Sequence, residues 1–253
     1  MTPTAPAEDA RFPEAHGPGP ETPDVEASSD AYARRFSGRV GEFFLEVQWR
    51  ATRELVEPWR GGRILDVGGG HGQLAIPLVR AGFDVTVVGS EATCERRLRD
   101  ALAPGSYTFR RGDLLDLPFG PETFEVVLAF RLLPHVRRWE RLIEEMCRVA
   151  RHRVVVDYPD VRSANFVSDR LFGLKKALEG DTRPYRCFRR AEIVAAFARH
   201  AFTPSAFCPQ FALPMVVYRT LRSVGLARRL ESAGRWLGLT RQFGSPVIAR
   251  FSR

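Results

Sequence analysis

An acid followed by four closely spaced glycines is the feature of this 253-residue chain best suited to bind a ligand. The apolar run 63–67 contains Asp66, and glycine occupies positions 68, 69, 70 and 72. Glycine adopts a positive φ readily and leaves backbone N–H groups open to a ligand. The run therefore predicts a strand that ends in a ligand-binding turn, with Asp66 placed to accept hydrogen bonds from a cationic group.

Two kinds of nucleotide-binding turn compete for this run. Residues 70–75 fit the G-x-G-x-x-A spacing of a dinucleotide-binding loop. That loop normally begins at the end of its strand, whereas here Asp66, Gly68 and Gly69 come first. The Asp66 carboxylate would repel a pyrophosphate and suits an ammonium group better, which argues against the dinucleotide loop.

The pattern Asp66-x-Gly68-x-Gly70-x-Gly72 resembles motif I of the class I S-adenosylmethionine-dependent methyltransferases. The ligand of that family carries an amino-acid ammonium group and a sulfonium. The resemblance covers roughly residues 60–160. It implies that S-adenosyl-L-methionine is the cofactor and that Asp66, Gly68, Gly70 and Gly72 bind it.

A second part of the family pattern follows in residues 112–130. Here the resemblance implies that Asp113 accepts a hydrogen bond from the adenine amino group and that Leu114 lies against the ring. It also places Phe130 at the end of the fourth strand, beside the cofactor. The alternative for Asp113 is a solvated acid in a turn. The segment 144–150 resembles a helix end that packs on the sheet and performs no chemistry.

The second strand departs from the family pattern. Class I enzymes usually place an acid at its end to bind both ribose hydroxyls, but this chain has Gly89 there. Either Glu91 reaches the ribose with help from Ser90, or Glu91 only adds charge to the first turn of the next helix. If neither residue reaches the ribose, we expect weaker cofactor binding or a loss of activity.

The order of elements predicts an α/β fold, because apolar β-branched runs alternate with helical segments. Strands are expected at 63–67, 84–88, 107–111, 124–130, 152–158, 202–210 and 246–251, and helices at 73–81, 92–102, 139–149 and 190–200. The resemblance implies a Rossmann-like, seven-stranded, mostly parallel sheet with helices on both faces. Its last two strands would form an antiparallel edge hairpin.

Charge divides the chain into two parts. Residues 1–30 contain six prolines and seven acids against one base, which predicts a disordered tail. That tail carries a net charge of −6 and residues 31–253 carry +14. A body this basic suits nucleic acid, an anionic membrane or an acidic substrate, or it reflects a general preference for arginine.

Targeting and metal-binding patterns are absent from the sequence. It lacks a secretory signal and an apolar run long enough to span a membrane, so a cytoplasmic protein is expected. The four cysteines show no C-x-x-C spacing, and with five scattered histidines they predict no metal site.

Three further segments are expected to surround the sites. Residues 31–60 are predicted to form lid helices, with Tyr32 and Phe36 flanking the sulfonium. The methyltransferase domain would span 61–253, with insertions at 159–188 and 213–240 that choose the substrate. The second insertion is basic and amphipathic; it either lies on an anionic membrane and delivers a lipid-like substrate, or packs against the sheet edge or the lid.

Catalytic candidates come from the loops after strands four and five, where an open α/β sheet binds ligands. Much of the catalysis would come from holding a nucleophile near the methyl group, a contribution of up to roughly 7–11 kcal/mol. His135 is the candidate general base, unless it only caps the next helix. Arg131 could hold an anionic substrate group or a neighbouring carboxylate. Tyr158 ends the fifth strand and completes the set.

The sequence thus predicts methyl transfer from S-adenosylmethionine to a small aromatic, acidic or lipid-like molecule, with possible peripheral contact to an anionic membrane. One alternative is a nucleic-acid methyltransferase. Against it, we find no added RNA-binding domain and no Asn/Asp-Pro-Pro-aromatic motif; residues 157–159 match it only in part. The other alternative is a cofactor-binding protein without turnover, which the glycine at position 89 favours and the intact glycine turn opposes.

Overall fold

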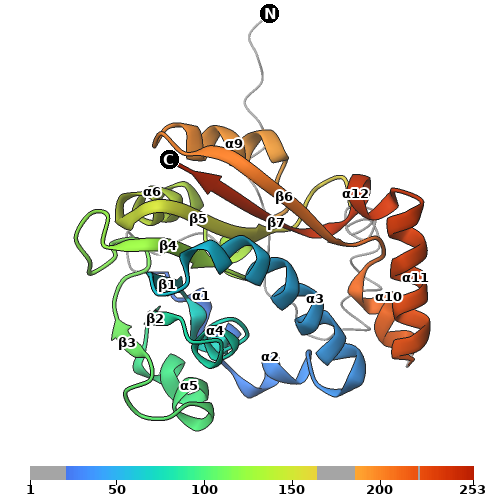
Figure 1. Cartoon of the computed structure of the whole chain (residues 1–253), viewed down its shortest axis with the longest axis horizontal. Coiled ribbons are helices and arrows are strands. Elements are labelled where there is room, and N and C mark those ends of the chain that lie inside the picture. The colour runs from blue at the N-terminus through green and yellow to red at the C-terminus, as the bar shows by residue number, and fades with distance from the viewer. Residues whose placement is uncertain (1–20, 164–185, 222) are drawn as a thin grey trace, which may run out of the picture.

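The computed structural model describes residues 21–163, 186–221 and 223–253. Within them, seven strands form one sheet in the order β3-β2-β1-β4-β5-β7-β6 (Figure 1). β7 is antiparallel to both of its neighbours, and the remaining pairs are parallel. This confirms the expected fold class. The strands are β1 Arg63–Val67, β2 Asp84–Gly89, β3 Thr108–Arg111, β4 Phe124–Ala129, β5 Ala150–Tyr158, β6 Thr203–Phe211 and β7 Ser245–Ser252.

Helices follow the predicted order with small shifts at their ends. The segment expected as one helix at 92–102 divides into a 3-10 turn and a short α-helix. The helices are α1 Pro23–Ala27, α2 Asp30–Arg34, α3 Gly38–Val56, α4 Ala75–Arg80, α5 Arg96–Ala101, α6 Trp139–Val149, α9 Arg190–Ala198, α10 Met215–Thr220, α11 Val224–Trp236 and α12 Leu239–Phe243. The 3-10 turns are η1 Glu57–Trp59, η2 Gly69–His71, η3 Ala92–Glu95 and η4 Leu133–His135.

Helices cover both faces of the sheet, as Figure 1 shows. One core lies between the sheet and α6 and α9, with Met146 and Phe197 fully buried. A second core lies under α3, α4 and α5 on the other face, with Val56, Leu78 and Leu98 fully buried. Central parallel strands are therefore apolar on both faces, which explains their continuous hydrophobic runs.

The N-terminal segment differs from the sequence-based expectation. A disordered tail was expected up to residue 30, but residues 23–27 and 30–34 are helical. Asp24 has 0% of its surface exposed. Acids of this segment form ion pairs with arginines of the basic body. Its negative charge, from which we expected a solvated tail, therefore attaches the segment to the fold. Residues 1–20 lie outside the described residues.

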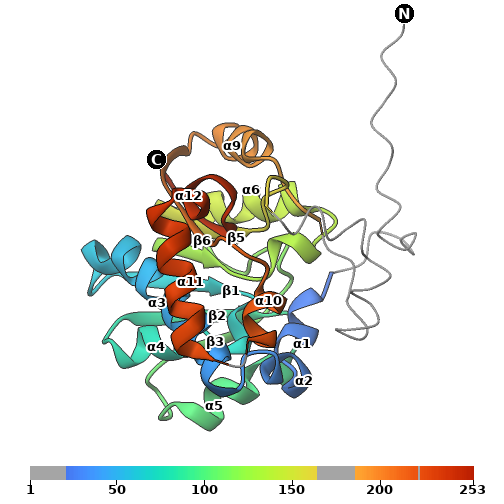
Figure 2. The same ribbon diagram turned by 90° about the vertical axis from the view of Figure 1, so that its right-hand side faces the viewer.

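The insertion at 213–240 folds into α10, α11 and α12 and packs on α3, in front of which α11 lies in Figure 2. Phe44 of α3 is the centre of this contact, with ring centroids 5.1 Å from Phe211 and 6.0 Å from Tyr218. Leu221, Val224 and Leu230 pack against the same cluster. These residues therefore pack against the helix α3 of the predicted lid, which is the second of the two alternatives for this insertion. Most of the other insertion, 159–188, falls on residues 164–185, outside the described residues.

Across the described ranges, we find no helix with the length and apolar character needed to cross a bilayer.

Replacing Phe44 with alanine should lower the free energy of unfolding by about 3–5 kcal/mol, because it leaves a cavity between α3, β6 and α10. Denaturant unfolding followed by circular dichroism measures this. Phe243, which is 40% exposed, supplies the control: Phe243→Ala should cost less than about 1 kcal/mol. Equal losses in the two variants would contradict this account of the packing.

Candidate functional site

The glycine turn forms as predicted directly after β1. Gly68 and Gly72 have φ angles of 69° and 72°, on either side of η2. The Gly68 N–H donates to the Val88 carbonyl at 2.8 Å, which fixes the turn against β2. A Cβ on Gly69 would lie 2.2 Å from Oδ2 of Asp66, so a side chain is excluded there. Glycine is thus required both for the backbone conformation and for close approach to Asp66.

Asp66 lies beneath this turn as an unpaired acid. Its surface is 0% exposed, and neither carboxylate oxygen accepts a hydrogen bond of good geometry from the described residues. Burial raises its pKa to about 7, and the nearby N–H of Ala75 offsets only part of that rise. A buried carboxylate without a partner is costly. The site therefore fits a cofactor with an ammonium group, which would give this carboxylate its missing donor.

Strand register brings the other predicted loops to the same edge. Asp66 stands opposite Val87 of β2 and Leu128 of β4. β3 joins through the pair Gly89 and Arg111. The loops that follow β1, β2, β3 and β4 therefore meet at the carboxyl edge of the sheet, where open α/β sheets bind ligands.

Asp113 lies one residue beyond Gly112, whose N–H donates to the Gly89 carbonyl at 3.0 Å. Oδ1 of Asp113 accepts from the N–H of Leu115 at 2.9 Å, and the side chain is half-buried. Leu114 is only 1% exposed and belongs to the core on the α6 face. The loop follows β3 at the carboxyl edge of the sheet, and protein atoms already cover almost all of Leu114.

Two residues of α6 hold this loop. Glu145 accepts from the N–H of Leu117 at 2.8 Å, and Arg148 donates to the carbonyls of Leu117 and Phe119. Burial acts to raise the pKa of Glu145, but the hydrogen bonds from Arg148 and from the N–H of Leu117, together with the charges of Arg148 and Arg141, outweigh it, so the pKa is lowered. The helix end that the sequence marked as structural thus fixes the loop carrying Asp113.

The end of β2 has no room for an acid. A Cβ on Gly89 would lie 2.8 Å from Cβ of Cys94 and 3.0 Å from Cζ of Phe109. Glu91 is exposed, and no hydrogen bond of its side chain to a described residue is found. Ser90 instead contacts an acid that the sequence did not single out: Asp24 accepts from its N–H at 2.8 Å and from its hydroxyl at 2.5 Å.

Arg131 acts as a link between segments. Its Nε donates to Gln73 at 2.7 Å and its Nη2 to Gln48 of α3 at 2.6 Å. Its guanidinium carbon lies 4.3 Å from the ring centroid of Phe36, and its N–H donates to Asp157 at 2.6 Å. Burial raises the pKa of Asp157. The guanidinium therefore holds two glutamines, whereas the sequence predicted an anionic substrate group or a carboxylate.

The other catalytic candidates fall in different surroundings. His135 closes η4, directly after β4, and is half-buried. Tyr158 is 0% exposed and packs 6.3 Å from Phe188 in the core on the α6 face. Burial raises the pKa of Tyr158 to about 12. A base of that pKa without exposed surface does not fit catalysis at neutral pH, so Tyr158 is a packing residue in this arrangement.

The aromatic cofactor candidates are largely buried. Tyr32 and Phe36 form a pair with ring centroids 5.6 Å apart, and each is 7% exposed. Phe130 is buried, and its carbonyl lies 3.3 Å from Nε2 of His71. Nδ1 of His71 accepts from the N–H of Gln73 at 3.0 Å. His71, which the sequence did not mark, thus joins the glycine turn to the end of β4.

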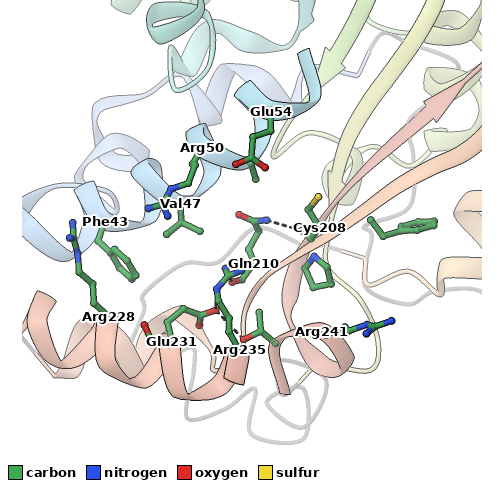
Figure 3. Close-up of a pocket in the computed structure, with 15 residues that line it drawn as sticks. Phe43, Val47, Arg50, Glu54, Cys208, Gln210, Arg228, Glu231, Arg235 and Arg241 are labelled. Carbon is green, nitrogen blue, oxygen red and sulfur yellow. Dashed lines mark hydrogen bonds and ion pairs between the residues drawn. The ribbon is translucent and has the colours of Figure 1, made fainter. Parts of the chain in front are cut away.

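A separate pocket of about 680 Å³ lies between α3, β6, α11 and α12 (Figure 3). None of its lining residues belongs to the glycine turn. Its wall combines apolar and charged groups, and Oε1 of Gln210 is buried there without a hydrogen-bond partner among the described residues. The walls include Phe43, Val47, Arg50, Phe207, Cys208, Gln210 and Arg241.

Comparison with known proteins agrees with this geometry. Residues 64–153 match the family model described as a methyltransferase domain. The chain is 36% identical over 119 residues to the phthiotriol/phenolphthiotriol dimycocerosates methyltransferase of Mycobacterium leprae, covering 43% of this chain and 41% of that protein. It is 34% identical over 114 residues to the demethylmenaquinone methyltransferase of a Roseiflexus species, covering 42% and 46%. The chain thus spans less than half the length of these relatives.

The fold is similar to that of solved structures over most of the chain. One is the magnesium protoporphyrin IX methyltransferase of Synechocystis PCC 6803 with bound S-adenosylhomocysteine, at a TM-score of 0.61 and 17% identity. The match covers 88% of this chain and 93% of that one. At this identity the likeness concerns the fold alone.

The buried acid predicts a pH-dependent effect of Asp66→Asn on stability. With a pKa raised from 3.8 to about 7, the stability associated with Asp66 is fully present below pH 3.8 and is lost as pH rises through 7. Asparagine does not ionise, so the free energy of unfolding of the variant should rise relative to that of the wild type between pH 4 and pH 8. For a shift of this size the gain is up to about 4 kcal/mol.

Denaturant unfolding at both pH values, without ligand, measures that gain. Ile64→Val in the same strand removes packing but no titratable group, so its effect should be the same at both pH values. A pH-independent effect of Asp66→Asn would contradict the raised pKa.

Proposed function

We propose that this chain, whose residues 64–153 match a methyltransferase domain, is a class I enzyme that transfers a methyl group from S-adenosylmethionine to a small molecule. The observation that carries the proposal is the unpaired, buried carboxylate of Asp66 beneath the glycine turn. It requires a cationic partner, and the turn around it excludes side chains. An ammonium-bearing cofactor would give the carboxylate a cationic partner, whereas a pyrophosphate would be repelled by it.

Named roles follow from the positions at the carboxyl edge. Asp66 receives the ammonium group, Gly68, Gly70 and Gly72 offer their backbone to the cofactor, and Asp113 meets the adenine. S-adenosylmethionine supplies an electrophilic methyl group on a sulfonium. A substrate nucleophile would form a bond to that carbon while the carbon–sulfur bond breaks, and its electron pair would stay with sulfur. The protein's contribution is to hold the nucleophile in line.

His135 is the proposed base for a nucleophile that must lose a proton. It follows β4 and stands at the same edge as the glycine turn, and an imidazole titrates near neutral pH. Arg131 is assigned a positioning role, because its guanidinium already holds Gln48 and Gln73. Tyr158 is not retained as a catalytic residue because it is fully buried.

We propose a lipid-like substrate and peripheral contact with an anionic membrane. The end of α11, the turn after it and the short helix α12 expose four large apolar side chains, which we call the exposed apolar cluster: Trp236 86%, Leu237 60%, Leu239 43% and Phe243 40%. Arg229, Arg235 and Arg241 are exposed in the same two helices. Tryptophan and leucine beside arginines suit a membrane interface. Relatives named for phthiotriol dimycocerosates and demethylmenaquinone support the proposal of a lipid-like substrate.

The pocket in Figure 3 supports an amphipathic substrate. α12 contributes both to that pocket and to the exposed apolar cluster. Phe43, Val47 and Phe207 provide apolar wall, and Oε1 of Gln210 can accept a hydrogen bond. A cytoplasmic protein that contacts the membrane surface at this cluster could take such a molecule from the bilayer.

Calorimetry tests the cofactor assignment. The wild-type chain should bind S-adenosylmethionine and S-adenosylhomocysteine and should not bind NAD. Asp66→Asn removes the charge but keeps the shape, and should weaken both sulfur ligands by about 10- to 100-fold, because a hydrogen bond to a charged group is lost. Ile64→Val should bind like the wild type. Binding of NAD in place of the sulfur ligands would sink the methyltransferase proposal.

Vesicle sedimentation tests the membrane proposal. The double variant Trp236→Ser/Leu237→Ser should bind vesicles of anionic phospholipid at least about 10-fold more weakly than the wild type, because two exposed apolar side chains no longer enter the interface. Leu226→Ser is the matched control: Leu226 is 43% exposed on the same helix, about 15 Å along it, and should have little effect. Equal binding by wild type and double variant would reject this surface.

A further inference from the structure

We propose that Asp24, in the N-terminal segment, is the ribose-binding acid of the cofactor pocket and replaces the acid that β2 lacks. The inference rests on the proposed cofactor. It concerns a residue outside the matched domain at 64–153, in a segment that composition alone marks as disordered.

Asp24 is held directly over the end of β2. Its Oδ2 accepts from the N–H of Ser90 at 2.8 Å and from Sγ of Cys94 at 3.3 Å, and its Oδ1 accepts from the Ser90 hydroxyl at 2.5 Å. Its Cβ lies 3.4 Å from where a Cβ on Gly68 would stand. The carboxylate therefore lies between the glycine turn and the loop after β2, where nucleotide-binding α/β folds place the acid that binds ribose.

The chemistry of this carboxylate suits a diol. Ionised carboxylates have about four acceptor positions, and three donors are present here, one of them a weakly donating thiol. Because Asp24 has no exposed surface, two adjacent ribose hydroxyls would reach it by displacing Cys94 as α1 shifts away from the glycine turn. No described arginine or lysine forms an ion pair with Asp24, so neutral hydroxyl donors match what this acid already binds.

The segment that carries Asp24 is anchored on both sides of the glycine turn. Upstream, Glu21 accepts from the N–H groups of Arg137 and Arg138 at 2.6 and 3.1 Å. Downstream, Asp30 forms ion pairs with Arg96 at 2.9 Å and Arg97 at 2.7 Å. Between these anchors, α1 contacts η2 and η3. We call residues 21–30 the acidic strap.

One further contact fits the strap to the turn. The hydroxyl of Ser28 donates to the Asp24 carbonyl at 2.8 Å and lies 2.6 Å from where a Cβ on Gly70 would stand. Gly70 therefore has to be glycine partly because the strap lies on it. A strap that only blocked the cofactor would instead give tighter binding when Asp24 is replaced.

The test compares two ligands on one set of full-length variants. S-adenosylhomocysteine and its 2′-deoxy analogue are titrated by calorimetry into the wild type, Asp24→Asn, Asp30→Asn and Glu26→Gln. The wild type should prefer the ribose form by about 10-fold or more. Asp24→Asn should lose about 10- to 100-fold in affinity for S-adenosylhomocysteine, and its preference over the deoxy analogue should fall to within about twofold.

The other two variants keep the result interpretable if Asp24→Asn loosens the strap. Asp30→Asn disturbs the downstream anchor without touching the ribose acid, so it should weaken both ligands alike and keep the preference. Glu26, an exposed acid of the same helix, should be replaceable by glutamine without effect.

Three outcomes would overturn the inference. Equal weakening of both ligands by Asp24→Asn would make Asp24 a purely structural contact. Tighter binding of both would mean that the strap blocks the site. A wild type that binds S-adenosylhomocysteine but shows no preference for the ribose form would place ribose recognition elsewhere. Failure of the wild type to bind either ligand would instead reject the cofactor assignment itself, and this inference with it.

Discussion

An uncompensated carboxylate inside the sheet is the constraint around which the cofactor edge is arranged. Asp66 has no exposed surface and no hydrogen-bond partner among the described residues, and burial raises its pKa to about 7. Placing an acid there costs stability that a purely structural design would avoid. Glycines surround the carboxylate, and Gly69 is in direct contact with it. Above the raised pKa of Asp66, a cationic ligand would offset this cost, and the site is in this sense prepared for such a ligand.

The opposite charges of the N-terminal segment and of the body explain how the cofactor edge of the sheet is covered. The body carries an excess of arginine, and the N-terminal thirty residues carry an excess of acids. Single exposed ion pairs contribute little to stability. Here, however, Glu21 and Asp30 each meet two consecutive residues of the body, Arg137–Arg138 and Arg96–Arg97. Such paired contacts set the path of the chain between them, and that path crosses the glycine turn.

The sequence predicted the features that depend on residues close together in the chain. Strand β1 and helix α6 have the bounds expected from their apolar patterns, and the glycine turn has the φ angles that its glycines suggest. Contacts between distant segments could not be predicted in this way. Asp24 meets Ser90 across 66 positions of sequence, and composition alone assigned it to a solvated tail. Tyr158 ends a strand as expected, but the alternation of side chains turns it into the core, away from Asp157.

Arg131 connects two segments that are far apart in the sequence. One side chain, on a backbone with a φ of 56°, reaches the first residues after the glycine turn through Gln73 and the middle of α3 through Gln48. The same helix α3 carries α10 and α11 through Phe44. One continuous helix, α3, therefore lies between the cofactor end of the sheet and the helices α10 and α11. The cofactor edge and the surface of α11 are built on the same helix, although they belong to segments far apart in the sequence.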